Sequence, residues 1–224
     1  IVGSGPAGLF AAWMLAENGF APVLLERGMP VRDRLVAVEA FWQGKPLRSD
    51  CNVQYGEGGA GTFSDGKLNT LVKDPTGRHK EVLHRFVLAG APEEILYVQK
   101  PHIGTDLLVN VVENIRNDIL RLGGEVHFNT KVTQLLTDSD GRCIGVTTED
   151  GRAYHSTQVI LAVGHSARDT YEMLYQKKMH IEQKAFAVGV RIEHPQAMIG
   201  ENQYGTFADL LPAADYKLTG HAES

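Results

Sequence analysis

Residues 1–8 read Ile1-Val2-Gly3-Ser4-Gly5-Pro6-Ala7-Gly8 and join a short apolar run to the start of a helix. In that context, the pattern G-x-G-x-x-G is the fingerprint of a dinucleotide-binding βαβ unit. Gly3 permits the tight turn, Gly5 lets the backbone approach a pyrophosphate, and Gly8 lets the helix pack close to the strand. The N–H groups at the start of the helix attract phosphates. We therefore expect Gly3-Ser4-Gly5-Pro6-Ala7-Gly8 to bind the pyrophosphate of a dinucleotide.

The next apolar run supplies the second half of the fingerprint. It reads Val23-Leu24-Leu25, short and uninterrupted, as expected of a buried parallel strand. Glu26 follows it, eighteen residues after Gly8. A carboxylate at this position accepts hydrogen bonds from ribose hydroxyls and disfavours a 2′-phosphate. We therefore expect Glu26 to bind a ribose and NADP to be excluded from this site.

The rest of the chain predicts an α/β fold. Apolar residues recur at helical spacing in four segments: residues 7–18, 31–42, 78–89 and 106–122. Gly19 is expected to end the first helix and Thr105 to cap the last. Strand patterns separated by turn residues follow at 125–129, 131–136, 143–149, 152–155 and 158–163. This order predicts a central parallel sheet, a three-stranded β-meander, and a return strand that ends at Gly164.

FAD and NAD share the fingerprint, and a resemblance favours FAD. The segments Pro6-Ala7 and Glu26-Arg27-Gly28 resemble the FAD fingerprint of the glutathione-reductase-like flavoproteins. In that superfamily, a meander precedes a strand that ends in an Ala-Thr-Gly-like segment. Here Val159-Ile160-Leu161-Ala162-Val163-Gly164 takes that place, with Val163 instead of the threonine. The resemblance implies a Rossmann-type FAD-binding domain, with Arg27, Ala162, Gly164 and the backbone of Val132 beside the cofactor.

A long glycine-rich loop, residues 43–67, follows the first βαβ unit. Its glycine density lets the backbone approach a ligand or form an anion-binding nest. The part expected to contact the cofactor is Gly58-Gly59-Ala60-Gly61-Thr62. Tyr55 and Phe63 are candidates to pack on the flavin ring. The alternative interpretation is a flexible surface loop.

Four longer stretches carry a closer resemblance. They are residues 56–68 (G-E-G-G-A-G-T-F-S-D-G-K-L), 102–106, 164–169 and 189–196. They look like a bacterial FAD-dependent dehydrogenase family, often labelled NAD(FAD)-utilizing dehydrogenases. The resemblance covers essentially the whole chain and implies FAD, a cytoplasmic oxidoreductase and a chain of about twice this length, without naming a substrate. Related flavoproteins complete their FAD site with a late Gly-Asp pair that this sequence lacks, so we expect a fragment of a longer protein.

Two residues are candidates for catalysis. His165 follows the strand-end glycine and could donate a proton beside a flavin. Lys67 could place a positive charge near the flavin N1 region. Structural roles are the alternatives: a histidine bonded to loop backbone, and a solvated cation. The nine histidines and two cysteines show no metal-ligand spacing, so no metal site is predicted.

The composition limits the kinds of partner that we expect the protein to bind. The net charge of −5 argues against a general nucleic-acid binder, and no apolar run reaches the ~20 residues of a membrane span. We expect a small-molecule substrate, a cytoplasmic location and no membrane partner; the oligomeric state is open.

Residues 1–174 are predicted to be the N-terminal part of the FAD-binding domain. Residues 175–224 are predicted to begin an inserted substrate or interface domain, entered through a strand-like run at 185–192.

The expected activity is hydride transfer through bound FAD to or from an unknown substrate. The chain holds no second G-x-G-x-x-G, so NAD(P)H is expected at most as a transient reductant. Three alternatives stay open. One is an NAD-dependent dehydrogenase that uses the first fingerprint directly. The others are an FAD-dependent tRNA-modifying or ring-hydroxylating enzyme, and a flavin-binding module without catalysis.

Overall fold

The computed structural model describes residues 1–224 except 64–65, 69–72, 99–100, 187, 191 and 215–224. Four positions inside the stretches quoted above, Ser64, Asp65, Ala187 and Arg191, therefore lie outside the described residues. The chain divides into two compact units, Ile1–His180 and Ile181–Ser224. The division observed follows His180, whereas the predicted domain boundary follows Leu174. The assignment of the later residues to a substrate or interface domain stays a prediction.

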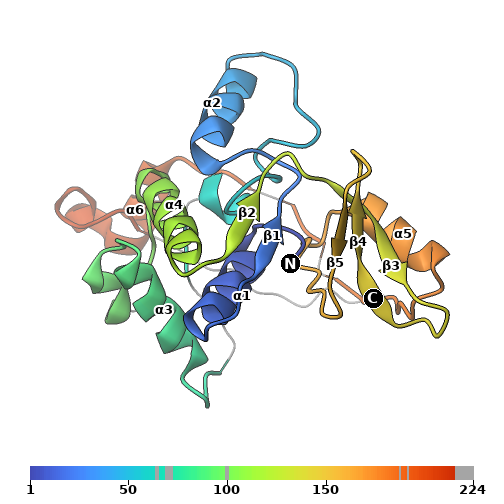
Figure 1. Ribbon diagram of the computed structural model, residues 1–224. Helices are drawn as coiled ribbons and strands as arrows, with labels where there is room; N and C mark the ends of the chain where they lie inside the picture. Colours follow the sequence, from blue (N-terminus) through green and yellow to red (C-terminus); the bar gives the residue numbers. More distant parts are fainter. Residues whose placement is uncertain (64–65, 69–72, 99–100, 187, 191, 215–224) are drawn as a thin grey trace. The chain divides into compact units, whose positions relative to one another are not determined.

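A parallel sheet lies at the centre of the first unit, as predicted (Figure 1). Strand β1 (Val23–Leu25) pairs in parallel with β2 (Glu125–His127). Val2 forms parallel bridges to Leu25 on one side and to Leu161 on the other. The amide N of Val2 donates to the carbonyl O of Ile160 at 2.8 Å, and the amide N of Ala162 donates to the carbonyl O of Val2 at 2.8 Å. The return strand therefore lies beside the first strand, and the parallel strands end at one edge.

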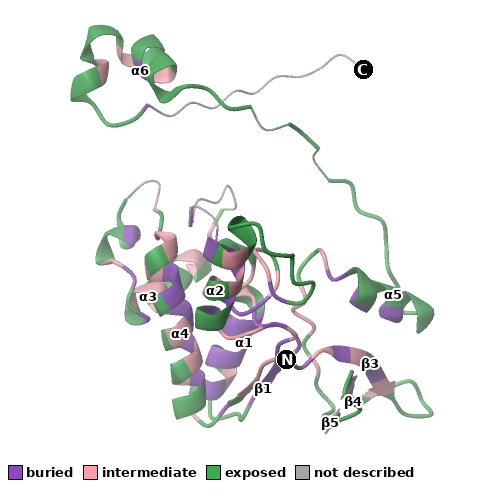
Figure 2. Ribbon diagram, turned by 90° about the horizontal axis from the view of Figure 1, so that it is seen from above, coloured by how far each residue is buried: buried purple, intermediate pink, exposed green. Residues whose placement is uncertain are grey.

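Two helices cover one face of this sheet and form the main core. Helix α1 (Pro6–Glu17) buries the side chains of Leu9, Ala12 and Trp13 against helix α4 (Thr105–Arg121). Their facing sides hold many of the buried residues in Figure 2. Gly19 has φ of 80° after α1, as expected for a residue that ends a helix.

Two further helices extend this unit. Helix α2 (Val31–Trp42) has the bounds expected from its periodicity, and α3 (Arg78–Leu88) ends one residue early. The predicted cap of α4 was wrong. Gly104 is the capping residue, with ψ of 153°, and Thr105 is already inside the helix, where its hydroxyl cannot serve as a cap.

The β-meander and one helix form a second, smaller core. The antiparallel strands are β3 (Val132–Thr137), β4 (Cys143–Thr148) and β5 (Ala153–His155), paired in sequence order as predicted. Helix α5 (Arg168–Gln176) contributes Met173 and Leu174 to the same cluster. Val2 and Leu25 of the parallel sheet also belong to this cluster, which fixes the meander beside the sheet.

The glycine-rich loop contains a short helical turn that the sequence pattern did not predict. A 3₁₀ helix, η1, spans Ala60–Phe63. A second 3₁₀ helix, η2 (Glu93–Leu96), follows α3. At the end of the loop, Lys67 forms an antiparallel bridge with His102.

The second unit contains helix α6 (Gln196–Tyr204) and a 3₁₀ helix, η3 (Gly205–Leu210). The strand expected at residues 185–192 was wrong for the part of that run that the structure describes. Phe186, Val188 and Val190 are each more than four-fifths exposed. A strand needs a partner for its backbone hydrogen bonds, and alternation of apolar residues does not supply one. Across the described residues, no helix combines the length and the apolar character needed to cross a membrane.

Candidate dinucleotide-binding site

A cavity of about 530 Å³ opens where the parallel strands end in the first unit. This volume is within the range of small-molecule and cofactor sites, about 300–1,000 Å³. Five segments that are distant in sequence form its wall. The lining includes Gly3, Gly5, Pro6, Ala7, Glu26, Arg27, Tyr55, Gly56, Gly59, Ala60, Gly61, Val132, Ala162, Val163, Gly164 and His165. The fold thus brings most of the predicted cofactor-binding residues together.

A side chain would have a different effect at each of the three glycines of the first turn. Gly3 has φ of 97°, and a Cβ there would lie 2.6 Å from the carbonyl O of Ala162. A Cβ at Gly8 would lie 1.8 Å from the carbonyl O of Gly3, so Gly8 sets the distance between α1 and the first strand. Gly5 is different, because the nearest atom to a Cβ there is the Cα of Gly59 at 3.9 Å. The fold therefore has space for a Cβ at Gly5, and a ligand in the cavity would exclude it.

Replacing Gly5 with alanine is therefore expected to leave the free energy of unfolding within about 0.5 kcal/mol of the wild-type value. The added methyl group enters the space through which the turn would approach a pyrophosphate, so the affinity for FAD is expected to fall at least about tenfold. Urea unfolding and a fluorescence titration with FAD measure the two quantities. Equal affinities for FAD in the variant and the wild type would show that Gly5 does not face the cofactor.

Glu26 links the first turn to the end of β1. The side chain is 5% exposed. Its Oε2 accepts from the amide N of Ser4 at 2.8 Å and from the Oγ of Ser4 at 2.7 Å, and its Oε1 accepts from the amide N of Gly28 at 2.7 Å. Oε2 already accepts two hydrogen bonds, but Oε1 accepts one and keeps a second lone pair, so Glu26 can still accept from a ribose hydroxyl while it holds the turn. Ser4 itself is buried behind the turn and does not line the cavity.

The second glycine-rich loop packs directly on the first. The amide N of Gly58 donates to the carbonyl O of Ser4 at 2.9 Å. A Cβ at Gly59 would lie 3.1 Å from the Cδ of Pro6, so a larger residue would separate the loops. Gly59, Ala60 and Gly61 line the cavity. The other two predicted loop contacts, Gly58 and Thr62, lie outside the lining, because the loop turns them toward the core.

The aromatic and basic candidates of the loop have different positions. Tyr55 lines the cavity. Phe63 is 8% exposed and lies beneath the guanidinium of Arg34, 4.6 Å from its Cζ, rather than in the lining. Lys67 is exposed and also lies outside the lining. His165 lines the cavity and is exposed.

Contacts across the cavity join the loop to the segment that follows the return strand. The hydroxyl of Tyr55 donates to the carbonyl O of Ser166, and the Nε2 of Gln54 donates to the Oγ of Ser166 at 2.6 Å. Arg27 forms an ion pair with Asp169 at 2.9 Å. Arg27 therefore lines the cavity with a charge already paired to the protein, which orients the guanidinium before any cofactor arrives.

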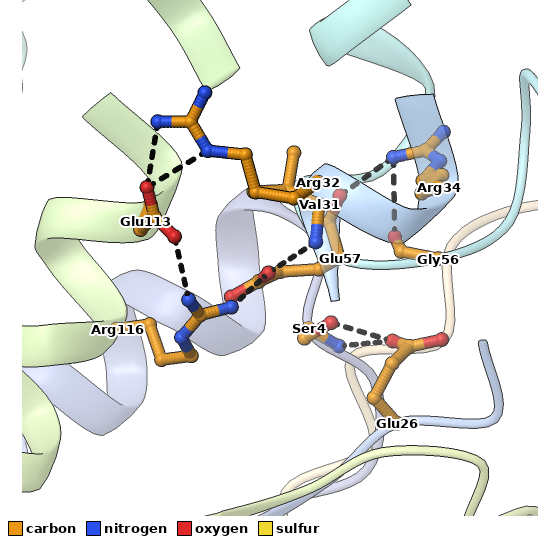
Figure 3. A network of polar contacts seen from close by, with 9 residues as sticks. All are labelled: Ser4, Glu26, Val31, Arg32, Arg34, Gly56, Glu57, Glu113 and Arg116. Carbon is orange, nitrogen blue, oxygen red and sulfur yellow. Dashed lines mark hydrogen bonds and ion pairs between the residues drawn. The ribbon is translucent and has the colours of Figure 1, made fainter. Parts of the chain in front are cut away.

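Three charged residues behind the site were not identified from the sequence (Figure 3). Glu57 is 0% exposed, and its Oε2 accepts from the amide N of Val31 at 2.6 Å and from the Nη1 of Arg116 at 2.6 Å. Its Oε1 is buried without a hydrogen-bond partner among the described residues. Burial raises the pKa of Glu57 to about 7, against the opposing effect of Arg116. Arg34 is the third, and it is also 0% exposed. No local pattern marks the contacts that Arg34 and Glu57 make, because these partners lie 18 to 59 positions away.

Three family models match the chain. Residues 1–30 match an NAD(P)-binding Rossmann-like domain, residues 82–187 match the flavin containing amine oxidoreductases, and residues 185–224 match the C-terminal domain-like region of FAD-dependent proteins. The first match covers the glycine turn and Glu26. The other two carry the FAD assignment, which the fingerprint alone did not settle.

The chain is also similar to two individual proteins, one in sequence and one in structure. An uncharacterized protein of Clostridium beijerinckii is 51% identical over 225 residues, which cover 100% of this chain and 42% of that protein. The chain therefore spans about two fifths of the length of this relative. The crystal structure of Thermovibrio ammonificans THI4 is similar with a TM-score of 0.51 and 18% identity, over 80% of this chain and 62% of that one. At this identity the likeness concerns the fold alone.

The fold and the family matches confirm the predicted Rossmann-type domain and FAD as the cofactor. The resemblance to the glutathione-reductase-like flavoproteins, and the closer one to the NAD(FAD)-utilizing dehydrogenases, go beyond what these matches establish. At the level they establish, this chain has a Rossmann-type dinucleotide-binding domain and is similar, over parts of its length, to flavin containing amine oxidoreductases and to FAD-dependent proteins.

Proposed function

We propose that the protein is an FAD-dependent oxidoreductase that transfers a hydride between a small-molecule substrate and the flavin. The observation that carries the proposal is the cavity in which the glycine turn, Glu26 and the second glycine loop meet the ends of the parallel strands. The matches to flavin containing amine oxidoreductases and FAD-dependent proteins support the oxidoreductase class. When bound, FAD supplies the two-electron chemistry, and the protein supplies binding, orientation and electrostatics.

The described residues fit the ADP half of FAD. The uncapped start of α1, with its N–H groups directed at the cavity, would hold the pyrophosphate. Glu26 would accept from the ribose hydroxyls. The backbone at Val132 and the segment Ala162–Gly164 would hold the adenine side, where the lining is mostly apolar. Tyr55 and His165 complete the rim and would limit the access of water to the cofactor.

The finer assignment is also a proposal. We infer that the protein is an NAD(FAD)-utilizing dehydrogenase of the glutathione-reductase-like type, located in the cytoplasm. It would act on a small molecule, without a nucleic-acid or membrane partner, and use NAD(P)H as a transient reductant. The support is the likeness of the stretches around Gly58, His102 and Gly164 to that family, together with the acidic net charge of −5.

A visible absorption spectrum of the purified complete protein tests the proposal. We expect a flavin spectrum that bleaches when NADH or NADPH is added without oxygen. In the Glu26→Gln variant, an amide NH₂ replaces one acceptor oxygen and faces the N–H groups of Ser4 or Gly28. Each lost charge-assisted hydrogen bond is worth about 1.5–3 kcal/mol, so the affinity for FAD should fall by about 10- to 100-fold. A colourless protein that binds NAD in place of FAD would replace this proposal with an NAD-dependent dehydrogenase.

A further inference from the structure

Arg34 lies behind the glycine-rich loop and bonds to its backbone (Figure 3). Its guanidinium donates to five main-chain carbonyls that all belong to residues 52–59. The Nε and Nη2 donate to Asn52 and Val53 at 2.9 Å each. The Nη1 donates to Gly56 at 3.3 Å, Glu57 at 2.6 Å and Gly59 at 2.8 Å. One side chain of α2 thus holds the carbonyl groups of a loop about 20 residues downstream.

A buried cation in such a place is costly unless its donors are satisfied. Arg34 is 0% exposed, and burial lowers its pKa to about 10, so it is protonated at neutral pH. Within the described part of the chain, the acceptors recorded for its guanidinium are main-chain carbonyls rather than carboxylates. Phe63 contacts the guanidinium at 4.6 Å and adds a cation–π interaction. The backbone of residues 52–59 therefore surrounds the guanidinium of Arg34.

The peptide plane transmits this arrangement to the cavity. In a trans peptide, the C=O and the N–H of one plane point in opposite directions. The carbonyl of Glu57 faces Arg34, and the N–H of the same plane, that of Gly58, donates to Ser4 on the other side. By the same geometry, the carbonyl of Gly59 faces Arg34 and the N–H of Ala60 points away from it. Gly59 and Ala60 line the cavity.

The loop also lacks space to adapt. Gly56 has φ of 118°, and a Cβ there would lie 2.6 Å from the Cδ of Arg34. A Cβ at Gly28 would lie 2.6 Å from the Cα of Gly56. The backbone of the loop, the end of β1 and the stem of Arg34 are thus in mutual contact. Movement of the guanidinium would shift the peptide planes of the loop.

We propose that Arg34 is a positioning residue for the cofactor, which orients the peptide group between Gly59 and Ala60 so that the N–H of Ala60 faces the FAD pyrophosphate. Arg34 itself does not line the cavity and acts through the loop. This inference rests on the proposed function, because it names the group that prepares the FAD site. It predicts that loss of the guanidinium weakens binding of the pyrophosphate but not binding of adenosine.

The test compares Arg34→Lys and Arg34→Ala in the complete protein after removal of bound flavin. Lysine keeps the charge, but its ammonium has three donors in a different geometry and cannot reach five carbonyls. We expect the dissociation constants of both FAD and ADP to rise at least about tenfold, while that of adenosine changes less than about twofold. Millimolar guanidinium should restore ADP binding to Arg34→Ala, and methylammonium should not. Arg32→Ala is the matched control, because this exposed arginine of α2 pairs with Glu113 and should leave ADP affinity unchanged.

Each outcome has a distinct meaning. Arg34→Lys with wild-type affinity for ADP, or equal losses for ADP and adenosine, would overturn the proposal. If both Arg34 variants fail to fold, Gly56→Ala becomes the test, since its Cβ displaces the stem of Arg34 without removing the charge. It should lose ADP affinity and keep adenosine affinity, and the reverse would overturn the proposal. Failure of the wild type to bind FAD would instead contradict the proposed function, while ADP binding would still test Arg34.

Discussion

Gly8→Ala is expected to lower the free energy of unfolding by about 3 kcal/mol or more and to abolish FAD loading. The new Cβ would lie 1.8 Å from the carbonyl O of Gly3 and 3.5 Å from the Cβ of Ala162. Gly3 cannot retreat, because its amide N donates to the carbonyl O of Leu25 at 2.8 Å and the return strand is on its other side. The start of α1 must therefore move away from the sheet, which removes its N–H groups from the pyrophosphate position.

Urea unfolding and the flavin absorbance of the purified variant measure these two effects. Gly61→Ala is the matched control for stability, because a Cβ there meets no atom within 4 Å and the backbone is not left-handed. The contrast with Gly5→Ala is equally informative, since that variant should lose FAD and keep its stability. A Gly8→Ala protein with the wild-type urea midpoint would show that α1 does not approach the strand as closely as described.

Arg116→Met is expected to lower the free energy of unfolding by about 3 kcal/mol at pH 8, because it leaves the buried carboxylate of Glu57 without its ionic partner. The loss should be smaller at pH 5, where Glu57 is protonated. Arg121→Met is the control, since Arg121 is 69% exposed and pairs with Asp118 at the surface. Such surface pairs contribute about 0–1 kcal/mol.

The pH dependence follows from the direction of the Glu57 shift. Its pKa is about 7 in the folded protein and about 4.5 in the reference state, so between these values the folded protein binds the extra proton. Stability contributed by this group is therefore present below about pH 4.5 and is lost as the pH rises toward 7, by about 3 kcal/mol. Glu57→Gln resembles the protonated carboxyl and should flatten this part of the profile. Identical profiles for Glu57→Gln and the wild type between pH 5 and 8 would contradict the assignment.

Local sequence patterns were sufficient to predict most of the helices and strands and the glycine-rich turn. The spacing of Gly3, Gly5 and Gly8 predicted the turn and the close packing of α1, and both effects act within eight residues. The helix at 31–42 and the three-stranded meander were predicted from periodicity and turn residues. Such signals are readable because a helix face or a hairpin depends on residues that are near one another in the chain.

Other features depended on packing between distant segments. The sequence pattern of 185–192 is that of a strand, but strand formation also requires a pairing partner, and the described residues of this run are largely exposed. In the second glycine loop, the pattern could not distinguish Gly58, which faces the core, from Gly59, which faces the cavity. The direction in which each peptide points is set by Arg34 on another element.

The sequence alone therefore determined the glycine turn, the place of Glu26 after the second strand and the α/β order of elements, because these are local patterns of spacing. The tertiary structure decided which loop groups face the cavity and which charges stabilise them. Arg34, Glu57 and Arg116 read as ordinary charged residues of a loop and two helices, and they become buried partners only when α2, α4 and the loop pack together. The physical reason is that a buried charge is acceptable only beside partners, and these partners meet through long-range contacts that no sequence spacing specifies.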